Sequence, residues 1–345
     1  MSQISEGRET SKPQVNVSDT NLTERLQKGY ADLKEQIHNV VVGQDEVLDS
    51  LLCCMLAGGH CIVMGVPGLA KTLMVHSVSE ALKMRFNRIQ FTPDLMPSDI
   101  TGTDIIQEDP ESRQRRYEFV HGPIFANVVL ADEINRTPPK TQAALLQAMQ
   151  EREVTVSGRT YKLEEPFFVL ATQNPIEQEG TYPLPEAALD RFMFMVYIDY
   201  PSEEEEQQIV KQTTSGKKTE VKQILSREDM LLFQEIVRMA PISNMVIEYA
   251  VRLARATRPD DPHATDMVKK YFKWGAGPRA GQYMTLGSKA RALIKGRINP
   301  SFEDVKKVCK LVLRHRVIVN FNAEADGISI EEILDDLIER VPLPK

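Results

Sequence analysis

The segment HCIVMGVPGLAKT spans residues 60–72 and joins three patterns in a row. Residues 60–64 form a short apolar run of the kind that predicts a buried parallel strand. Residues 65–70 are mostly small and include two glycines, and a helical pattern follows from Lys71. A glycine-rich loop between a strand and a helix suits phosphate binding, because backbone N–H groups of the loop and of the helix N-terminus point toward the anion.

The side chains of this loop also suit a bound nucleotide. Lys71 would bring a positive charge near the β- and γ-phosphates, and the Thr72 hydroxyl could ligate Mg²⁺. Ala70 departs from the general pattern GxxxxGK[ST], in which a glycine precedes the lysine. A plain strand-to-helix turn would also need small residues, so the prediction depends on the flanking strand and helix. The residues that we predict to bind the nucleotide here are Gly65, Val66, Pro67, Gly68, Leu69, Ala70, Lys71, Thr72 and Leu73.

A second apolar run, residues 128–131, ends in the two carboxylates Asp132 and Glu133. Ligands of open α/β sheets bind at the carboxyl edge of the strands. We therefore predict that Asp132 holds Mg²⁺, directly or through water, and that Glu133 activates the attacking water as a general base. An Asp-Glu pair after a strand is often only a solvated loop, but a pair about 60 residues beyond a phosphate-binding loop is a specific signal.

Apolar runs of strand length recur at residues 88–91, 167–171 and 194–198, and helical patterns lie between the runs. Strands that alternate with helices predict an α/β fold with a five-stranded parallel sheet. Residues 104–119 and 154–163 break this alternation and predict two inserted β-hairpins. The division that we predict is a disordered tail at residues 1–21, an α/β nucleotide-binding domain at 22–200 and an α-helical lid domain at 203–345.

The composition of the 345-residue chain excludes several classes of protein. Hydrophobic residues make up 42% and charged residues 26%, which is typical of globular proteins and not of disordered, fibrous or coiled-coil chains. No apolar window reaches the roughly 18 residues of a membrane span, and no signal-peptide pattern opens the chain, so we expect no membrane span and a cytoplasmic location. The net charge of −7 disfavours direct binding of nucleic acid.

Several motifs follow one another along the chain and together are far more specific than any one of them. They are GVPGLAKT at residues 65–72, ADEINR at 131–136, ATQNP at 171–175, LPEAALDRF at 184–192, GAGPRA at 275–280 and LRHR at 313–316. In this combination the chain resembles the MoxR family of AAA+ ATPases, in which an alanine before the lysine is usual. The resemblance covers residues 41–316 and implies an AAA+ module that binds ATP and Mg²⁺.

The resemblance assigns further site residues. Asn174, which follows the fourth apolar run, would hydrogen-bond the γ-phosphate or the attacking water, the role called sensor 1. Arg191 would act as an arginine finger in the neighbouring subunit's site and neutralise charge on the transferred phosphoryl group. Arg279, at the start of a predicted helix, would reach the γ-phosphate of its own subunit as sensor 2. The adenine would pack against Val42 and Gly43.

Three further arginines, Arg136, Arg314 and Arg316, could also contact a neighbouring subunit. For these we favour structural ion pairs within the subunit. The phosphate-loop and Asp-Glu predictions do not depend on them.

The resemblance also implies an activity, the Mg²⁺-dependent hydrolysis of ATP to ADP and phosphate by a homohexameric ring. The two hairpins would face the ring axis and carry movement to a protein client, because MoxR relatives are similarly chaperone-like and often work with a protein that carries a von Willebrand factor A domain. A magnesium-chelatase-like motor subunit would share these inserts. An ATP-gated assembly scaffold with little turnover is a further alternative, against which the retention of both Asp132 and Glu133 argues. A nucleic-acid motor is a minor alternative, since the first hairpin carries mixed charge.

Overall fold

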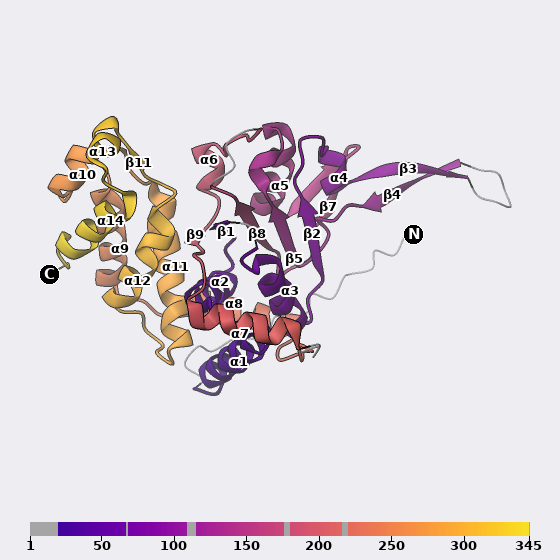
Figure 1. Ribbon diagram of the computed structural model, residues 1–345, viewed down its shortest axis with the longest axis horizontal. Coiled ribbons are helices and arrows are strands. Elements are labelled where there is room, and N and C mark those ends of the chain that lie inside the picture. Colours follow the sequence, from indigo (N-terminus) through magenta and orange to yellow (C-terminus); the bar gives the residue numbers. More distant parts are fainter. Residues whose placement is uncertain (1–19, 67, 109–114, 176–179, 216–219, 345) are drawn as a thin grey trace, which may run out of the picture.

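The computed structural model describes residues 20–66, 68–108, 115–175, 180–215 and 220–344. Its centre is a five-stranded parallel sheet in the order β2-β5-β8-β1-β9, which confirms the predicted fold class (Figure 1). The strands are β1 (Cys61–Met64), β2 (Phe86–Gln90), β5 (Val128–Asp132), β8 (Phe168–Gln173) and β9 (Phe194–Tyr197).

Both faces of the sheet are covered by helices. One face contributes residues such as Val63 and Leu170 to a core shared with α1 (Thr20–His38), α2 (Asp45–Leu56) and α3 (Lys71–Ala81). The alternate residues, such as Val129 and Ala171, pack against α5 (Pro139–Glu151) on the other face. Burial on both faces explains why β1, β5, β8 and β9 appear in the sequence as apolar runs, whereas the edge strand β2 alternates between exposed and buried residues.

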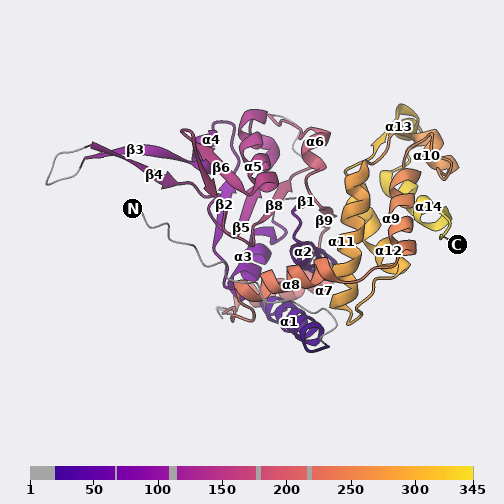
Figure 2. The same ribbon diagram turned by 180° about the vertical axis from the view of Figure 1, so that it is seen from behind.

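Both predicted hairpins are present and antiparallel. The first joins β3 (Gly102–Glu108) to β4 (Arg115–His121) and is preceded by α4 (Pro97–Thr101), and the second joins β6 (Glu153–Val156) to β7 (Arg159–Lys162). The ring of Phe119 on β4 stacks on the ring of Tyr161 on β7 with centroids 4.2 Å apart, which holds the two hairpins together. Figures 1 and 2 show the first hairpin projecting away from the sheet, on the side opposite to the C-terminal helices.

The C-terminal part is helical, as predicted, but it also contains a short antiparallel pair of strands. The pair is β10 (Phe272–Trp274) with β11 (Ile318–Val319). These strands have only three and two residues, too few to show an alternating pattern in the sequence. The helices are α7 (Glu203–Thr214), α8 (Arg227–Met239), α9 (Asn244–Ala256), α10 (Asp266–Tyr271), α11 (Pro278–Ile294), α12 (Phe302–Leu313), α13 (Phe321–Asp326) and α14 (Ile330–Arg340).

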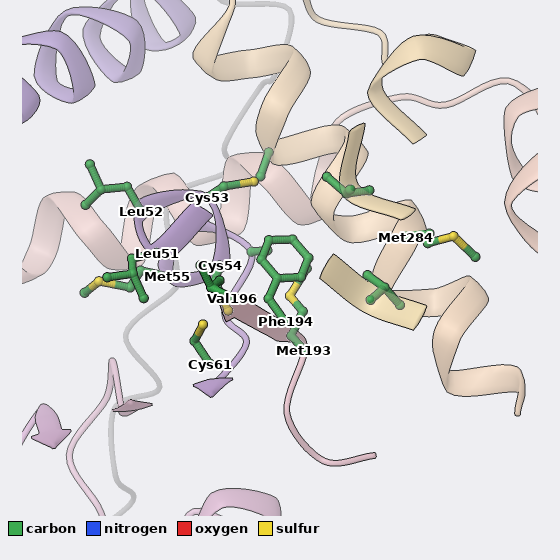
Figure 3. Close-up of a cluster of buried hydrophobic side chains, with 14 of the residues drawn as sticks. Leu51, Leu52, Cys53, Cys54, Met55, Cys61, Met193, Phe194, Val196 and Met284 are labelled. Atoms are coloured by element: carbon green, nitrogen blue, oxygen red, sulfur yellow. The ribbon is translucent and has the colours of Figure 1, made fainter. Parts of the chain in front are cut away.

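The sheet and the C-terminal helices share one apolar core. Phe194 of β9 and the adjoining Met193 lie between Cys54 of α2 and Met284 of α11 (Figure 3). A Cβ atom at Gly287 of α11 would lie 3.0 Å from the Phe194 ring, so the glycine lets that ring approach the helix closely. The predicted domain boundary near residue 203 therefore stays a prediction, because the core continues across it.

The N-terminal helix α1 begins at Thr20, slightly before the predicted start at residue 22. Residues 1–19 of the predicted tail lie outside the described residues. Within the described ranges, none of the helices alone has the length and apolarity needed to cross a membrane, although α8 and α9 taken together, bent by 93° at their junction, meet that test by length and composition.

Candidate functional site

The loop predicted to bind phosphate leaves β1 at the carboxyl edge of the sheet and enters α3 at Lys71. A Cβ atom at Gly65 would lie 2.0 Å from Ile198 Cγ2 and 2.8 Å from the Ile198 carbonyl oxygen, so only glycine fits there. Gly68 has a φ of +86° and open space at the position of a Cβ, which leaves room for a ligand against its backbone. Pro67, also predicted to bind the nucleotide, lies outside the described residues.

Ala70 adopts the left-handed conformation, with φ 54° and ψ 19°, at the position where the general pattern has glycine. We expect Ala70→Gly to raise the free energy of unfolding by about 0.5–1 kcal/mol, because strain of about 1–2 kcal/mol is removed while the unfolded chain gains flexibility. Urea denaturation measures the change. The matched control is Ala143→Gly, at an exposed position within α5, which should lower stability by about 1 kcal/mol. A lower stability for Ala70→Gly would contradict the assigned strain.

A cleft of about 420 Å³ opens between this loop and the carboxyl ends of β5 and β8. It brings together most of the residues predicted for phosphate, metal and water. The lining residues are Gly68, Ala70, Lys71, Thr72, Leu73, Arg88, Asp132, Glu133, Thr172 and Asn174.

Lys71 is anchored at the floor of this cleft. Its Nζ donates a hydrogen bond of 2.9 Å to the Gly65 carbonyl oxygen. Burial lowers the pKa of the Lys71 ammonium below its usual value, and the carboxylates of Asp132 and Glu133 act in the opposite direction. Because burial disfavours the charged ammonium, binding of an anion such as phosphate next to it would be favourable.

The Thr172 hydroxyl connects the Asp132 carboxylate with the backbone of Glu133 at the end of β5. Thr172 on β8 donates from Oγ1 to Asp132 Oδ1 at 2.5 Å, and it accepts the backbone N–H of Glu133 at 2.9 Å. Glu133 has a left-handed backbone with φ 57°, and its Oε2 accepts a 2.8 Å hydrogen bond from Gln90 Nε2. Arg136, in the 3₁₀ helix η1 (Ile134–Arg136), pairs with Glu133 at 3.2 Å, which agrees with the ion-pair role predicted for it.

The residues present fit a Mg²⁺ ion with a nucleotide. Thr72 and Asp132 line the same cleft, and Asn174, which is 7% exposed, follows β8 at its rim. Mg²⁺ in nucleotide sites is held by one or two protein oxygens together with phosphate oxygens, so a cluster of acidic residues is not required. Arg88 donates to Asp132 Oδ2 from Nη2 at 2.6 Å and from Nε at 3.1 Å, and it neutralises that carboxylate in this structure.

The predicted adenine residues, Val42 and Gly43, are not among the residues that line this cleft. A Cβ atom at Gly43 would lie 2.3 Å from Glu205 Oε1, and Gln44 Nε2 donates to the Asp199 carbonyl oxygen at 3.0 Å. Gly43 and Gln44 thereby lie against the segment that follows β9, the same segment whose Ile198 packs on Gly65. Their predicted role stays a prediction.

Arg191 and Arg279 lie together at the opposite end of the sheet. Both line a second pocket of about 220 Å³ beside Gly58, Gly59 and His60, which precede β1. β1 has four residues, so the two ends of this strand lie about 13 Å apart. Arg279 Nη1 donates to Asp190 Oδ2 at 2.6 Å.

The predicted contact of Arg279 with its own subunit's phosphates stays a prediction. The start of α11 was predicted correctly, at Pro278. What the pattern did not reveal is the end of the sheet that this helix faces. The two arginines form one cationic surface, together with Arg152 and Arg238, at the end of the sheet remote from the phosphate cleft.

Comparison with known proteins agrees with these features. Residues 60–194 match the family described as "ATPase family associated with various cellular activities (AAA)", and residues 264–337 match the AAA lid domain. The chain is 42% identical to Chaperone MoxR1 of Mycobacterium tuberculosis over 310 residues, which cover 90% of this chain and 81% of the relative. The chain belongs to the MoxR family of AAA+ ATPases.

Other relatives are consistent with that family. YeaC of Bacillus subtilis is 39% identical over 90% of this chain and 93% of its own length, and protein MoxR of Methylorubrum extorquens is 27% identical over 91% and 95%. The crystal structure of a putative ATPase from Cytophaga hutchinsonii superimposes with a TM-score of 0.88 at 39% identity, covering 95% of this chain and 98% of that one.

Sequence analysis missed three residues of this MoxR-family ATPase, Arg88, Gln90 and Thr172. Each contacts Asp132 or Glu133, as described above. Arg88 and Gln90 are exposed on β2 while Ile89 between them is buried. This alternation indicates polar side chains at the end of β2. It predicts their contact with Asp132 and Glu133 only when the pairing of β2 with β5 is also known.

Proposed function

We propose that this protein hydrolyses ATP with Mg²⁺ and couples hydrolysis to the remodelling or maturation of a protein client. The observation that supports this best is the single cleft that holds Lys71, Thr72, Asp132, Glu133 and Asn174. These side chains supply a phosphate-binding cation, two metal ligands, a general base and an amide, which is the set that phosphoryl transfer to water requires.

The roles follow from the contacts. Bound Mg²⁺, held by Thr72 and Asp132, would neutralise charge on the β- and γ-phosphates. Glu133 orients and deprotonates the attacking water, and Asn174 holds that water or the γ-phosphate. Arg88 donates to Asp132 Oδ2, so it would compete with a bound metal for the negative charge of this carboxylate.

The second half of the proposal is assembly. Arg191 lies at the end of the sheet remote from its own phosphate cleft, so the nucleotide on which it acts belongs to a neighbouring subunit. We propose a homohexameric ring, in which Arg191 and Arg279 of one subunit face the cleft of the next. This is a change from the role within one subunit expected for Arg279.

The exposed side chains of the first hairpin favour the proposal that the client is a protein. Ile106 and Tyr117 are directly paired across β3 and β4, and they are 59% and 74% exposed. Exposed aromatic and aliphatic side chains on a projecting arm suit contact with another protein. A partner with a von Willebrand factor A domain remains part of this proposal.

Nucleotide binding tests the phosphate-loop assignment. We expect Lys71→Ala to weaken ATP binding about 10- to 100-fold, because it removes a charge-assisted contact worth about 1.5–3 kcal/mol. Titration with a fluorescent ATP analogue and Mg²⁺ measures the change. Lys307→Ala, at an exposed lysine on α12, is the control and should bind as wild type does. Tight binding by Lys71→Ala would overturn the assignment.

Turnover tests the activity itself. We expect phosphate release per subunit to rise with protein concentration until assembly is complete, because each site needs Arg191 of a neighbour. ATP that is bound but not hydrolysed at any concentration would instead indicate an assembly scaffold.

A further inference from the structure

The segment 190–193 links α6 (Glu186–Leu189) to β9 and carries Arg191. All four carbonyl oxygens of this segment accept hydrogen bonds from side chains of the C-terminal helical part, the longest at 3.4 Å from Arg316 Nη1 to Met193. Arg316 Nη2 donates to the Asp190 carbonyl at 2.8 Å and to the Phe192 carbonyl at 2.6 Å. The Tyr283 hydroxyl on α11 donates to the Arg191 carbonyl at 3.2 Å.

The side chain of Asp190 adds a second connection between the same parts. Its Oδ1 accepts from Arg316 Nε at 2.9 Å, and its Oδ2 accepts from Arg279 Nη1 at 2.6 Å. Arg316 follows α12 and Arg279 opens α11, so one carboxylate bridges two C-terminal helices.

The contact between segment 190–193 and the C-terminal helices is tightly packed around Arg316. The Arg316 side chain is 1% exposed, and its guanidinium lies 5.1 Å from the centroid of the Tyr283 ring. A buried guanidinium is tolerated only while its N–H groups are paired. If the C-terminal helices slid along segment 190–193, the Arg316 guanidinium would lose these partners and remain buried as an unpaired charge. The C-terminal helices and this segment must therefore move together.

The guanidinium of Arg191 is held by residues of the α/β part, not by the C-terminal helices. Its Nε donates to Gln150 Oε1 at 2.9 Å, and its Nη1 donates to the Ala187 carbonyl at 2.9 Å. The Arg191 backbone is held by the Tyr283 hydroxyl, and the backbones of Asp190 and Phe192 on either side are held by Arg316. The direction of the Arg191 side chain therefore depends on Tyr283 and Arg316 as well as on its own hydrogen bonds.

We propose that Asp190 and Tyr283 are positioning residues for Arg191, and that with Arg316 they make the position of the C-terminal helices set the position of the arginine in the neighbouring subunit's site. This rests on the proposed function, in which Arg191 acts across the interface. The nucleotide state of one subunit would thereby reach the catalytic site of the next through its helical part.

The milder test is Tyr283→Phe, which removes one hydroxyl and keeps the ring beneath Arg316. We expect kcat to fall about 3- to 10-fold with an unchanged KM for ATP, because a single hydrogen bond that orients a group acting in the transition state is lost. The matched control is Tyr271→Phe, whose hydroxyl donates to Asp326 at 3.0 Å elsewhere in the helical part, and its kcat should match wild type. An unchanged kcat in Tyr283→Phe would overturn the proposal.

The decisive test uses mixed assemblies. Asp190→Asn should lower kcat about 10- to 100-fold, since the carboxylate that pairs with two arginines is lost. The Asp190→Asn chain and the Glu133→Gln chain are coexpressed, each with its own affinity tag. Assemblies that carry both tags are then purified. About one quarter of the interfaces in a random ring would pair an intact cleft with a correctly held Arg191, so turnover should return to about a quarter of wild type.

The same mixture made with Arg191→Ala separates the two proposals. Recovery with Arg191→Ala but not with Asp190→Asn would mean that Asp190 serves its own subunit's cleft, which overturns the positioning role and leaves the proposed function intact. Failure of Arg191→Ala to recover would overturn action across the interface, and the positioning role with it.

Discussion

Replacing Arg191 with alanine is expected to lower kcat for ATP hydrolysis on the order of 10³-fold, because an arginine that neutralises the transferred phosphoryl group acts almost wholly in the transition state. ATP affinity should change little, since the phosphate cleft at the other end of the sheet keeps all its lining residues. Steady-state phosphate release and an ATP-binding titration on the same preparation separate the two effects.

The control for this experiment is another surface arginine. Arg340, paired with Asp336 on α14, lies away from both pockets, so Arg340→Ala should hydrolyse ATP at the wild-type rate. Native mass spectrometry must show the same assembly for wild type, Arg191→Ala and Arg340→Ala. Full turnover by Arg191→Ala in an intact assembly would assign the catalytic cation to another residue of the same pocket, such as Arg152 or Arg238.

Glu133→Gln is expected to lower kcat by about 10²- to 10⁴-fold, the usual contribution of a general base. The amide keeps the shape of the side chain and can still accept the hydrogen bond from Gln90, so the fold around β5 should persist. ATP binding should also persist, because Lys71 and Thr72 are unchanged. This variant should therefore hold ATP for long periods, which a single-turnover experiment measures directly.

The matched control for Glu133→Gln is Glu151→Gln. Glu151 is exposed at the end of α5 and accepts a hydrogen bond from Gln147, away from the phosphate cleft. Its substitution should leave both turnover and ATP retention as in wild type. If Glu133→Gln kept wild-type turnover, the water would have to be activated by another group.

Much of the nucleotide cleft could be predicted from sequence because its parts are local. Residues 60–72 contain a strand, a turn and a helix start within one short segment, and Asp132 and Glu133 follow directly on β5. Strands β1, β5, β8 and β9 were predictable for a related reason, since burial on both faces demands apolar runs, while the edge strand β2 gave a weaker signal.

The features that were missed depend on pairing between distant segments. Arg88 reaches Asp132 because β2 lies beside β5, and Thr172 does so because β8 lies on the other side of β5. Gly277 and Pro278 likewise indicate the start of α11 but carry no information about the end of the sheet that this helix faces. Strand order and helix orientation are decided by packing, which single-sequence patterns do not encode.

The apolar contact of Phe194 with α11 has a further consequence for how the chain unfolds and how it can be divided. Cutting the chain after residue 200 would uncover Met193, Phe194 and the buried side of α2 in a single patch. Exposed apolar surface of that kind promotes aggregation. The α/β part and the helical part should therefore melt in one cooperative transition, and neither should survive limited proteolysis as a stable fragment.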